Sequence, residues 1–316
     1  MEEMSDQGLS SSNRDIWIPL RMKDMTPEMI RRVKGVLDRI PNMPISVHRV
    51  IQMISDSKTS SKEIADIAAS DPVLVSNILM MVNSSYYGMN RKIDNLRLAI
   101  VLLGFNEVRS IAIRCGFSQM LKHLGGDTAY DVSNLWRHSY LVSQCTEHFA
   151  GDDDPQLAGE LLTLGLLHDI GKFALYAVGL ILKQRGLKPA GTEPLPPDAH
   201  ILAKEEWLFG VNHAIVGGFL TQRWNLSERI CTVIECHHYP SFFGINDIPE
   251  EYNEDVAIVC ISDLIVNRFE HPENPLKYPH PRFFELLGLD PDIDRAVTPE
   301  LSRRLDRAGK FLNGLE

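Results

Sequence analysis

Helix signals recur along almost the whole chain, and they constrain its fold more than any other feature of the sequence. Thr26-Pro27-Glu28 offers a cap, a proline at the first helical position and an early carboxylate. Apolar residues then recur at helical spacing from Ile30 to Ile40, so the sequence predicts a helix there. Similar patterns continue to the end of the chain, and nothing has clear strand character. The sequence therefore predicts an all-α fold.

The predicted helices fall into two series, separated near Gly125-Gly126. After the first helix, the first series covers residues 45–54, 60–69, 71–82, 95–103 and 106–123. The second series covers residues 131–149, 154–177, 197–209, 212–224, 227–238, 249–270 and 298–313. The proline-rich stretches 188–198 and 271–281 are expected to be loops, because proline blocks helix continuation. We therefore expect a loosely ordered tail over residues 1–25, an N-terminal helical lobe over 26–126, and a second helical lobe with a C-terminal helix over 127–316.

Charge and composition limit the classes of partner. The formal net charge of −10 over 316 residues disfavours nucleic acid, although a local basic pocket could still bind one phosphoester. The N-terminus is acidic and polar, unlike a signal peptide, and no stretch approaches the ~20 apolar residues of a membrane span. We therefore expect a cytoplasmic protein without a membrane segment. The five cysteines include no CxxC pair and are expected to be reduced.

Histidines and aspartates with the character of metal ligands recur along the second lobe. They are His138, the pair His168-Asp169, His213, the pair His237-His238, and Asp263. Each lies within a predicted helix or at its end, and helical bundles build metal sites from facing helices. Imidazole and carboxylate ligands together suit Fe, Mn, Zn, Co or Ni, whereas the absence of thiolates argues against a structural zinc site.

Asp169 gives the strongest single indication of a cation. It lies in the run LGLLHDIGKFAL, where an ionised carboxylate would carry a large desolvation cost unless it were paired or coordinated. The alternative for any one histidine is a hydrogen-bonded core residue. Taken together, the leucine-rich surroundings of His168-Asp169 and the doubled His237-His238 favour a metal site over core packing. Because a carboxylate can span two cations, Asp169 is the expected bridging ligand.

Several of these segments, with others in the first lobe, are similar to motifs of the HDOD family, a branch of the HD superfamily. In the second lobe they are LWRHS at 135–139, GLLHDIGK at 165–172, His213 with Gly217, HHYP at 237–240, and Ser262-Asp263. In the first lobe they are LDRIPNMP at 37–44, IADI at 64–67, DPVL at 71–74, NSSYYG at 83–88, and LLG at 102–104. The resemblance implies an all-α, HD-domain-like fold and a bacterial signalling role, for which many members serve as regulatory or interaction modules.

The ligand set is fuller than in many HDOD members and resembles that of metal-dependent HD phosphohydrolases, especially the HD-GYP branch. This implies two divalent metal ions, Fe or Mn foremost with Zn, Co or Ni as alternatives. The implied ligands are His138, His168, Asp169, His213, His237, His238 and Asp263. The resemblance also implies that Lys172, the lysine of the HDxGK motif, contacts phosphate, and Arg137 is a weaker candidate for that role. The alternatives are a surface lysine for Lys172 and a surface salt bridge for Arg137.

The chain departs from the HD-GYP branch at two places. Tyr239-Pro240-Ser241 follows His237-His238 in place of the HHExxDGxGYP signature, so hydrolysis of cyclic di-GMP is not supported. Asn134 stands where trinuclear members carry a glutamate, so two metals are expected rather than three. Glu160 is a distant further candidate, for which a solvated or capping carboxylate is the preferred interpretation.

Two classes of function remain open. The first is a bacterial HDOD signal-transduction protein that retains an HD-type metal site and acts as a regulatory module on signalling protein partners. The second is an active phosphohydrolase, a phosphomonoesterase or phosphodiesterase for a nucleotide or another phosphoester, with Asp169 and Lys172 as catalytic residues. Nucleotide binding without turnover is a third possibility.

Overall fold

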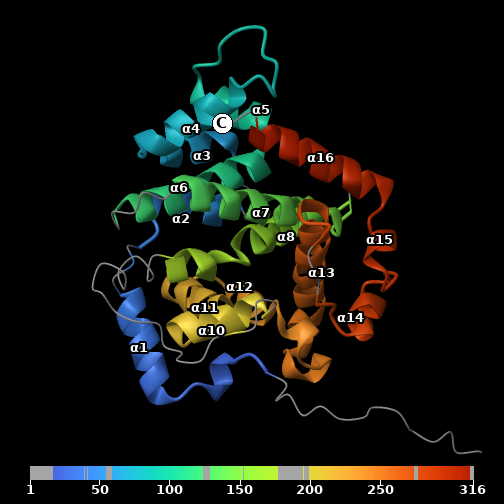
Figure 1. Cartoon of the computed structure of the whole chain (residues 1–316). Coiled ribbons are helices and arrows are strands. Elements are labelled where there is room, and N and C mark those ends of the chain that lie inside the picture. Colours follow the sequence, from blue (N-terminus) through green and yellow to red (C-terminus); the bar gives the residue numbers. More distant parts are fainter. Residues whose placement is uncertain are drawn as a thin grey trace, which may run out of the picture.

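The computed structural model describes residues 17–313 apart from 39, 41, 55–58, 124–128, 152, 177–194, 196–198 and 274–276. The described residues form helices joined by turns and loops, and no strand occurs among them (Figure 1). The predicted all-α fold is confirmed.

Side-chain caps set the starts of several helices in the N-terminal part. The helices are α1 (Pro27–Leu37), α2 (Ile45–Ile54), α3 (Ser61–Ala68), α4 (Pro72–Val82), α5 (Leu96–Leu103) and α6 (Phe105–His123). Ser60 and Glu63 form a capping box at the start of α3. Asp71 and Asn95 accept hydrogen bonds from backbone N–H groups in the first turns of α4 and α5. The predicted starts of these three helices agree with the structure to within a residue.

The second part of the chain differs from the predicted helix pattern in two places. Its helices are α7 (Ala129–His148), α8 (Pro155–Leu167), α10 (Ile201–Phe209), α11 (His213–Arg223), α12 (Glu228–Cys236), α13 (Asn253–Glu270), α14 (Pro281–Leu286), α15 (Ile293–Ala296) and α16 (Pro299–Asn313). The predicted helix 154–177 is interrupted, because α8 ends at Leu167, a turn holds residues 168 and 169, and a helix resumes over 170–176. The short helices α14 and α15 were not predicted, since neither is long enough to show an apolar period.

The structure describes most of one proline-rich segment and little of the other. The described residues of 271–280 are not helical, as expected for a loop, and Pro281 then begins α14. The stretch 188–198 lies outside the described residues except for residue 195.

A continuous apolar core joins the helices of both parts. The helices α7 and α8 pack along each other in the middle of the molecule, with α13 and α16 against α7 (Figure 1). The core includes Val47 and Ile78 from the N-terminal part together with Leu141, Leu167 and Ile265, all at most 1% exposed. The helices that carry the candidate ligands are therefore held by the same core as the N-terminal helices.

The C-terminal helix α16 connects the two parts. Its Phe311 ring lies 5.0 Å from the Tyr86 ring of the N-terminal part and 5.3 Å from the Tyr140 ring of α7, measured between centroids. The predicted amphipathic helix over 298–313 therefore packs on the body of the protein.

Residues 17–25 contact the body of the protein, so the expected loosely ordered tail does not extend to residue 25. The backbone N–H of Leu20 donates to Glu206 at 2.8 Å, and the Asn212 side chain donates to the Leu20 carbonyl at 3.0 Å. Arg21 forms an ion pair of 2.9 Å with Asp247, and Met25 is buried. These contacts lie far apart in the sequence, which is why local composition did not reveal them.

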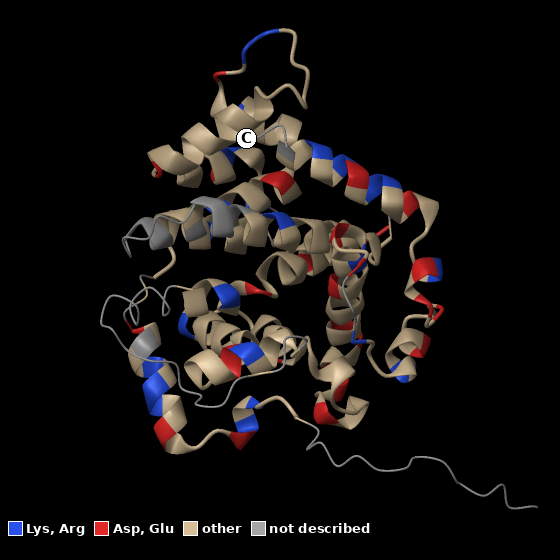
Figure 2. Ribbon diagram, viewed as in Figure 1, with Lys and Arg blue, Asp and Glu red and all other residues tan. Residues whose placement is uncertain are grey.

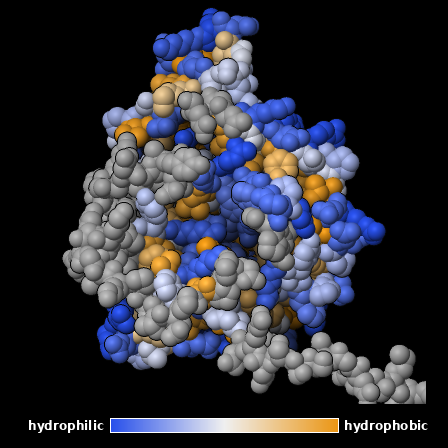
Figure 3. Space-filling view, in the orientation of Figure 1, coloured by the Kyte–Doolittle hydropathy of each residue, from blue (hydrophilic) through white to orange (hydrophobic). Residues whose placement is uncertain are grey.

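The surface mixes charges of both signs. Lys and Arg alternate with Asp and Glu along α16 (Figure 2). On the face seen in Figure 3, hydrophilic residues cover most of the described surface and apolar residues form small separate patches. Within the described part of the chain, every helix is too short or too polar to cross a membrane.

Candidate metal centre

The structure brings all seven predicted metal ligands together. They are His138 on α7, His168 and Asp169 after α8, His213 at the start of α11, His237 and His238 after α12, and Asp263 on α13. Helix ends position most of them. For example, the Asn212 side chain accepts a hydrogen bond from the Ile215 N–H, which makes His213 the first residue of α11.

Six of these residues form two groups around the seventh. Group A contains His138, His168 and Asp263, and group B contains His213, His237 and His238. Within each group, one ligand atom from each residue lies within 4.8 Å of the others. Such spacing suits three ligands around one cation in each group.

Asp169 lies between the two groups and presents one carboxylate oxygen to each. Its Oδ2 is 3.3 Å from His168 Nε2 and 3.9 Å from His138 Nε2, on the group A side. Its Oδ1 is 3.1 Å from His213 Nε2 and 4.0 Å from His237 Nε2, on the group B side. Asp169 is only 1% exposed, so water cannot compensate its charge. This arrangement is what a carboxylate that bridges two cations requires.

Hydrogen bonds turn the ligand nitrogens of the histidines inward. His168 Nδ1 is 2.8 Å from the Gly165 carbonyl, and His237 Nδ1 is 2.7 Å from the Ile234 carbonyl. A carbonyl can only accept, so each Nδ1 carries a proton, and in the neutral ring each Nε2 then keeps a lone pair. The buried His168 Nε2 has no hydrogen-bond partner among the described residues. A buried acceptor without a partner is costly, and a divalent cation would satisfy it, so the residues fit a metal.

Two glutamates that were not predicted from the sequence support two further histidines, His213 and His138. Glu205 Oε2 lies 2.7 Å from His213 Nδ1, and Glu270 Oε2 lies 3.0 Å from His138 Nδ1. Glu270 follows Asp263 by two helical turns on α13, a spacing that places both on one face and could have revealed it. For Glu205 no comparable sequence signal exists.

The charges of the centre are balanced by protons in the metal-free protein. Burial alone would raise the pKa of Asp169, but His168 and other neighbours hold it well below its usual range. Burial alone would lower the pKa of His138 and of His213, but neighbouring carboxylates raise both to about 9. Burial and the nearby His213 lower the pKa of His237 to about 3. Protons therefore occupy positions where divalent cations would also be stabilised.

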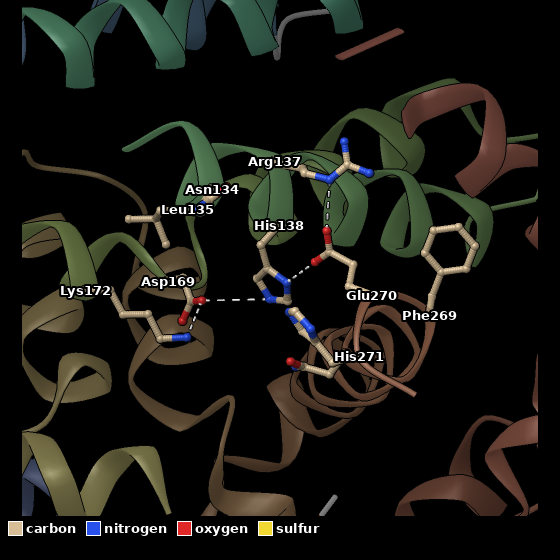
Figure 4. Close-up of a pocket in the computed structure, with 10 residues that line it drawn as sticks. Asn134, Leu135, Arg137, His138, Asp169, Lys172, Phe269, Glu270 and His271 are labelled. Carbon is tan, nitrogen blue, oxygen red and sulfur yellow. Dashed lines mark hydrogen bonds and ion pairs between the residues drawn. The ribbon is translucent and has the colours of Figure 1, made fainter. Parts of the chain in front are cut away.

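A cavity of about 680 Å³ opens beside group A. Figure 4 shows the predicted phosphate-contacting residues, Lys172 and Arg137, on opposite sides of His138. A chain of side-chain contacts joins the two residues. Lys172 lies 2.6 Å from Asp169, which lies 3.9 Å from His138. His138 lies 3.0 Å from Glu270, which lies 3.2 Å from Arg137. Both cationic side chains therefore lie where a phosphoester in the cavity could reach them.

The remaining candidates lie outside the two groups. Glu160, for which a solvated or capping carboxylate was preferred, pairs with Arg229 outside both groups. Asn134 lines the cavity. His200 packs its ring 5.7 Å from that of His238, while its Nδ1 accepts a hydrogen bond from the Leu202 N–H. It is a neighbour of group B that sequence spacing did not reveal.

Comparison with known proteins gives a family and several structural relatives. The sequence model of the HDOD domain matches residues 40–240, which is more than half of the chain. An uncharacterized protein of Treponema pallidum is 23% identical over 257 residues, a match that covers 81% of this chain and 47% of that protein. The chain thus spans about half the length of this curated relative.

Two solved structures with low sequence identity share the fold. A protein of Marinobacter aquaeolei VT8, provisionally named a signal transduction protein, is 17% identical with a TM-score of 0.68, and the match covers 90% of this chain and 65% of that one. A protein of Shewanella amazonensis SB2B, provisionally named a metal-dependent phosphohydrolase, is 16% identical with a TM-score of 0.53, and the match covers 91% and 99%. These likenesses establish the helical architecture.

Proposed function

This chain belongs to the HDOD domain family, as its sequence motifs predicted, and we propose that it is a metal-dependent phosphohydrolase acting on a nucleotide or another small phosphoester. The observation that carries the proposal is the position of Asp169, whose two oxygens face two separate groups of ligands. Groups A and B would each hold one divalent cation, with Asp169 shared between them. When bound, two such cations supply Lewis acidity and a hydrolytic nucleophile at neutral pH.

The residues of the chain itself would orient the phosphoester. The Lys172 ammonium lies at the edge of the cavity and would offset charge that develops on the phosphoryl group. Arg137, on the far side of His138, offers a second cation for a distal part of the same substrate. A cavity of about 680 Å³ is within the range of small-molecule sites, which suits a nucleotide-sized ligand better than a polymer.

The donor set narrows the choice of metal. It combines imidazoles with carboxylates and contains no thiolate. Such sets suit Fe or Mn, with Zn, Co or Ni as alternatives. The Shewanella relative is provisionally named a metal-dependent phosphohydrolase, which is a statement about that protein.

A second candidate is a regulatory module in bacterial signalling that holds metal without turnover. One observation favours it: both candidate phosphate contacts are already engaged, Lys172 with Asp169 and Arg137 with Glu270. In that case occupancy of the centre would be communicated to a signalling partner through packing. The Marinobacter relative carries a name of this class.

Elemental analysis and a hydrolysis panel distinguish the candidates. Protein purified without chelator would be analysed for metal and then assayed against phosphomonoesters, phosphodiesters and nucleotides. The variant His168→Ala removes the buried candidate ligand whose Nε2 has no partner, whereas His148→Ala, at the last residue of α7 and outside both groups, serves as the control. Metal-dependent turnover that only His168→Ala abolishes supports the phosphohydrolase. Bound metal without turnover supports the regulatory module, and absence of metal under metal-replete conditions contradicts both.

A further inference from the structure

Each group of the candidate metal centre has its own outer carboxylate. We infer that Glu270 for group A and Glu205 for group B are positioning residues, and that they support the two cation sites separately. The inference rests on the proposed metal centre and goes beyond it, because neither glutamate is a ligand. The cation affinity of group A would then depend on Glu270, and that of group B on Glu205.

Glu270 orients His138 from the outer side of group A. Its Oε2 accepts from His138 Nδ1 at 3.0 Å, which leaves His138 Nε2 toward Asp263 at 2.9 Å. The other oxygen, Oε1, accepts from Arg137 Nε at 3.2 Å, so the carboxylate is held on both sides (Figure 4). The Glu270 side chain is 13% exposed, which limits competition by water.

Glu205 orients His213 from the outer side of group B. Its Oε2 accepts from His213 Nδ1 at 2.7 Å and from the His213 backbone N–H at 2.8 Å. The carboxylate therefore fixes both the ring and the first residue of α11, where a negative charge is also favoured by the helix dipole. The Glu205 side chain is 9% exposed.

Backbone carbonyls, and not carboxylates, orient two other histidines of the centre. His168 and His237 each donate Nδ1–H to a carbonyl three residues earlier, and these backbone acceptors are retained when either glutamate is changed. Each group therefore contains one histidine whose tautomer is fixed by a carboxylate. Without that carboxylate, the proton can move to Nε2, and the ring then no longer offers a lone pair to the cation.

The two supports lie on different helices. Glu205 belongs to α10 and Glu270 to α13, and no described residue hydrogen-bonds to both. The groups share Asp169, which remains intact when either glutamate is changed. Loss of one support should therefore weaken one cation site much more than the other.

Manganese binding can test this separation in the intact protein. Two stepwise dissociation constants for Mn²⁺ would be measured on wild type, Glu205→Gln, Glu270→Gln and the double variant, with electron paramagnetic resonance to distinguish single from paired ions. Matched controls are Glu206→Gln, adjacent to Glu205 but bonded to Leu20 and Asn212, and Glu254→Gln, exposed on α13. Thermal unfolding of each variant checks that the fold is retained.

We expect each single variant to weaken one binding step by about 10–100-fold and to leave mainly unpaired Mn²⁺, with both steps weakened only in the double variant. The controls should match wild type. Two unchanged steps in both single variants, or equal weakening of both steps in each, would overturn the inference. Wild type that binds no Mn²⁺ would instead overturn the metal centre itself, so the two failures are distinguishable.

Discussion

Lys172 Nζ lies 2.6 Å from Asp169 Oδ2, the oxygen that faces group A. The ammonium would therefore compete with a group A cation for the charge of the same oxygen. Lys172 should be a competitor of metal binding and, at the same time, a contact for phosphate.

The Lys172→Met variant tests these two roles together. Removal of the competing charge should strengthen binding of the group A cation a few-fold, whereas the proposed phosphoester hydrolysis should slow by about 10²–10³-fold, as for other charge-stabilising groups. Metal titration and kinetics on the same preparations provide the measurement. Lys204→Met, exposed on α10, is the control, and weaker metal binding in Lys172→Met would contradict the competition.

In the proposed centre Asp169 would serve both groups, so the Asp169→Asn variant should lose both cations. An amide is neutral and a poorer ligand, and it cannot neutralise two divalent ions in a site that is almost fully buried. Elemental analysis should find metal content near zero, while the exposed Asp153→Asn keeps the wild-type content. Full occupancy in Asp169→Asn would show that the bridging assignment is wrong.

Metal affinity should rise with pH. In the metal-free protein, neighbouring carboxylates raise the pKa of His138 and of His213 to about 9, against the effect of burial, so both rings are protonated at pH 7. A cation must displace one proton in each group, and the apparent affinity of each site should therefore increase about tenfold per pH unit up to about pH 9. Calorimetry in buffers of different ionisation enthalpy should detect about one proton released per cation. Binding without proton release would contradict the prediction.

The candidate ligand residues could be predicted from the sequence, but their division into two groups could not. Asp169 is a carboxylate within a leucine-rich run, and this position alone indicated a cation. Which histidines face which oxygen of Asp169 depends on how α7, α11, α12 and α13 turn toward one another, and a single sequence does not encode that locally. Glu205 was missed for the same reason, because nothing in its surroundings separates it from a surface glutamate.

The start of a helix was predictable where a side-chain cap marks it. The starts of α3, α4 and α5 carry side-chain caps, and all three were found. The end of α8 carries no comparable signal in the sequence, because residues 161–167 and 170–175 are almost uniformly apolar and look like one helix. The turn that places His168 and Asp169 in the centre was therefore invisible in the sequence.

Glu107 should make stability depend on pH. Burial raises its pKa to about 7, although the Tyr140 hydroxyl donates to it at 2.8 Å and opposes part of that shift. The folded state thus holds a proton that the unfolded chain releases near its ordinary pKa of 4.5. The contribution of this proton to the stability of the fold is fully present below about pH 4.5 and is lost as the pH rises to about 7.

The Glu107→Gln variant should lack this dependence. As the pH rises from 5 to 8, wild type should lose about 1–3 kcal/mol of unfolding free energy that Glu107→Gln keeps. Urea unfolding at the two pH values measures the difference, and the exposed Glu285→Gln should show none. An identical pH response of Glu107→Gln and wild type would refute the prediction.

Gly171 allows the helical segment 170–176 to touch the start of α11. A Cβ added to Gly171 would lie 1.8 Å from the His213 carbonyl oxygen and 2.7 Å from the Gly217 nitrogen, both backbone atoms that cannot move independently. The Gly171→Ala variant must therefore separate the two helical segments, and with them Asp169 from His213. We expect a loss of about 3 kcal/mol or more of unfolding free energy, together with loss of metal from group B.

Urea unfolding and elemental analysis of Gly171→Ala measure both effects. Gly244→Ala is the matched control, because a Cβ there would meet nothing within 4 Å. If Gly171→Ala kept wild-type stability and full metal content, this close approach would not hold the centre together. The expected result would give the glycine of the HDxGK motif a physical reason: it places the bridging carboxylate within reach of the first histidine of α11.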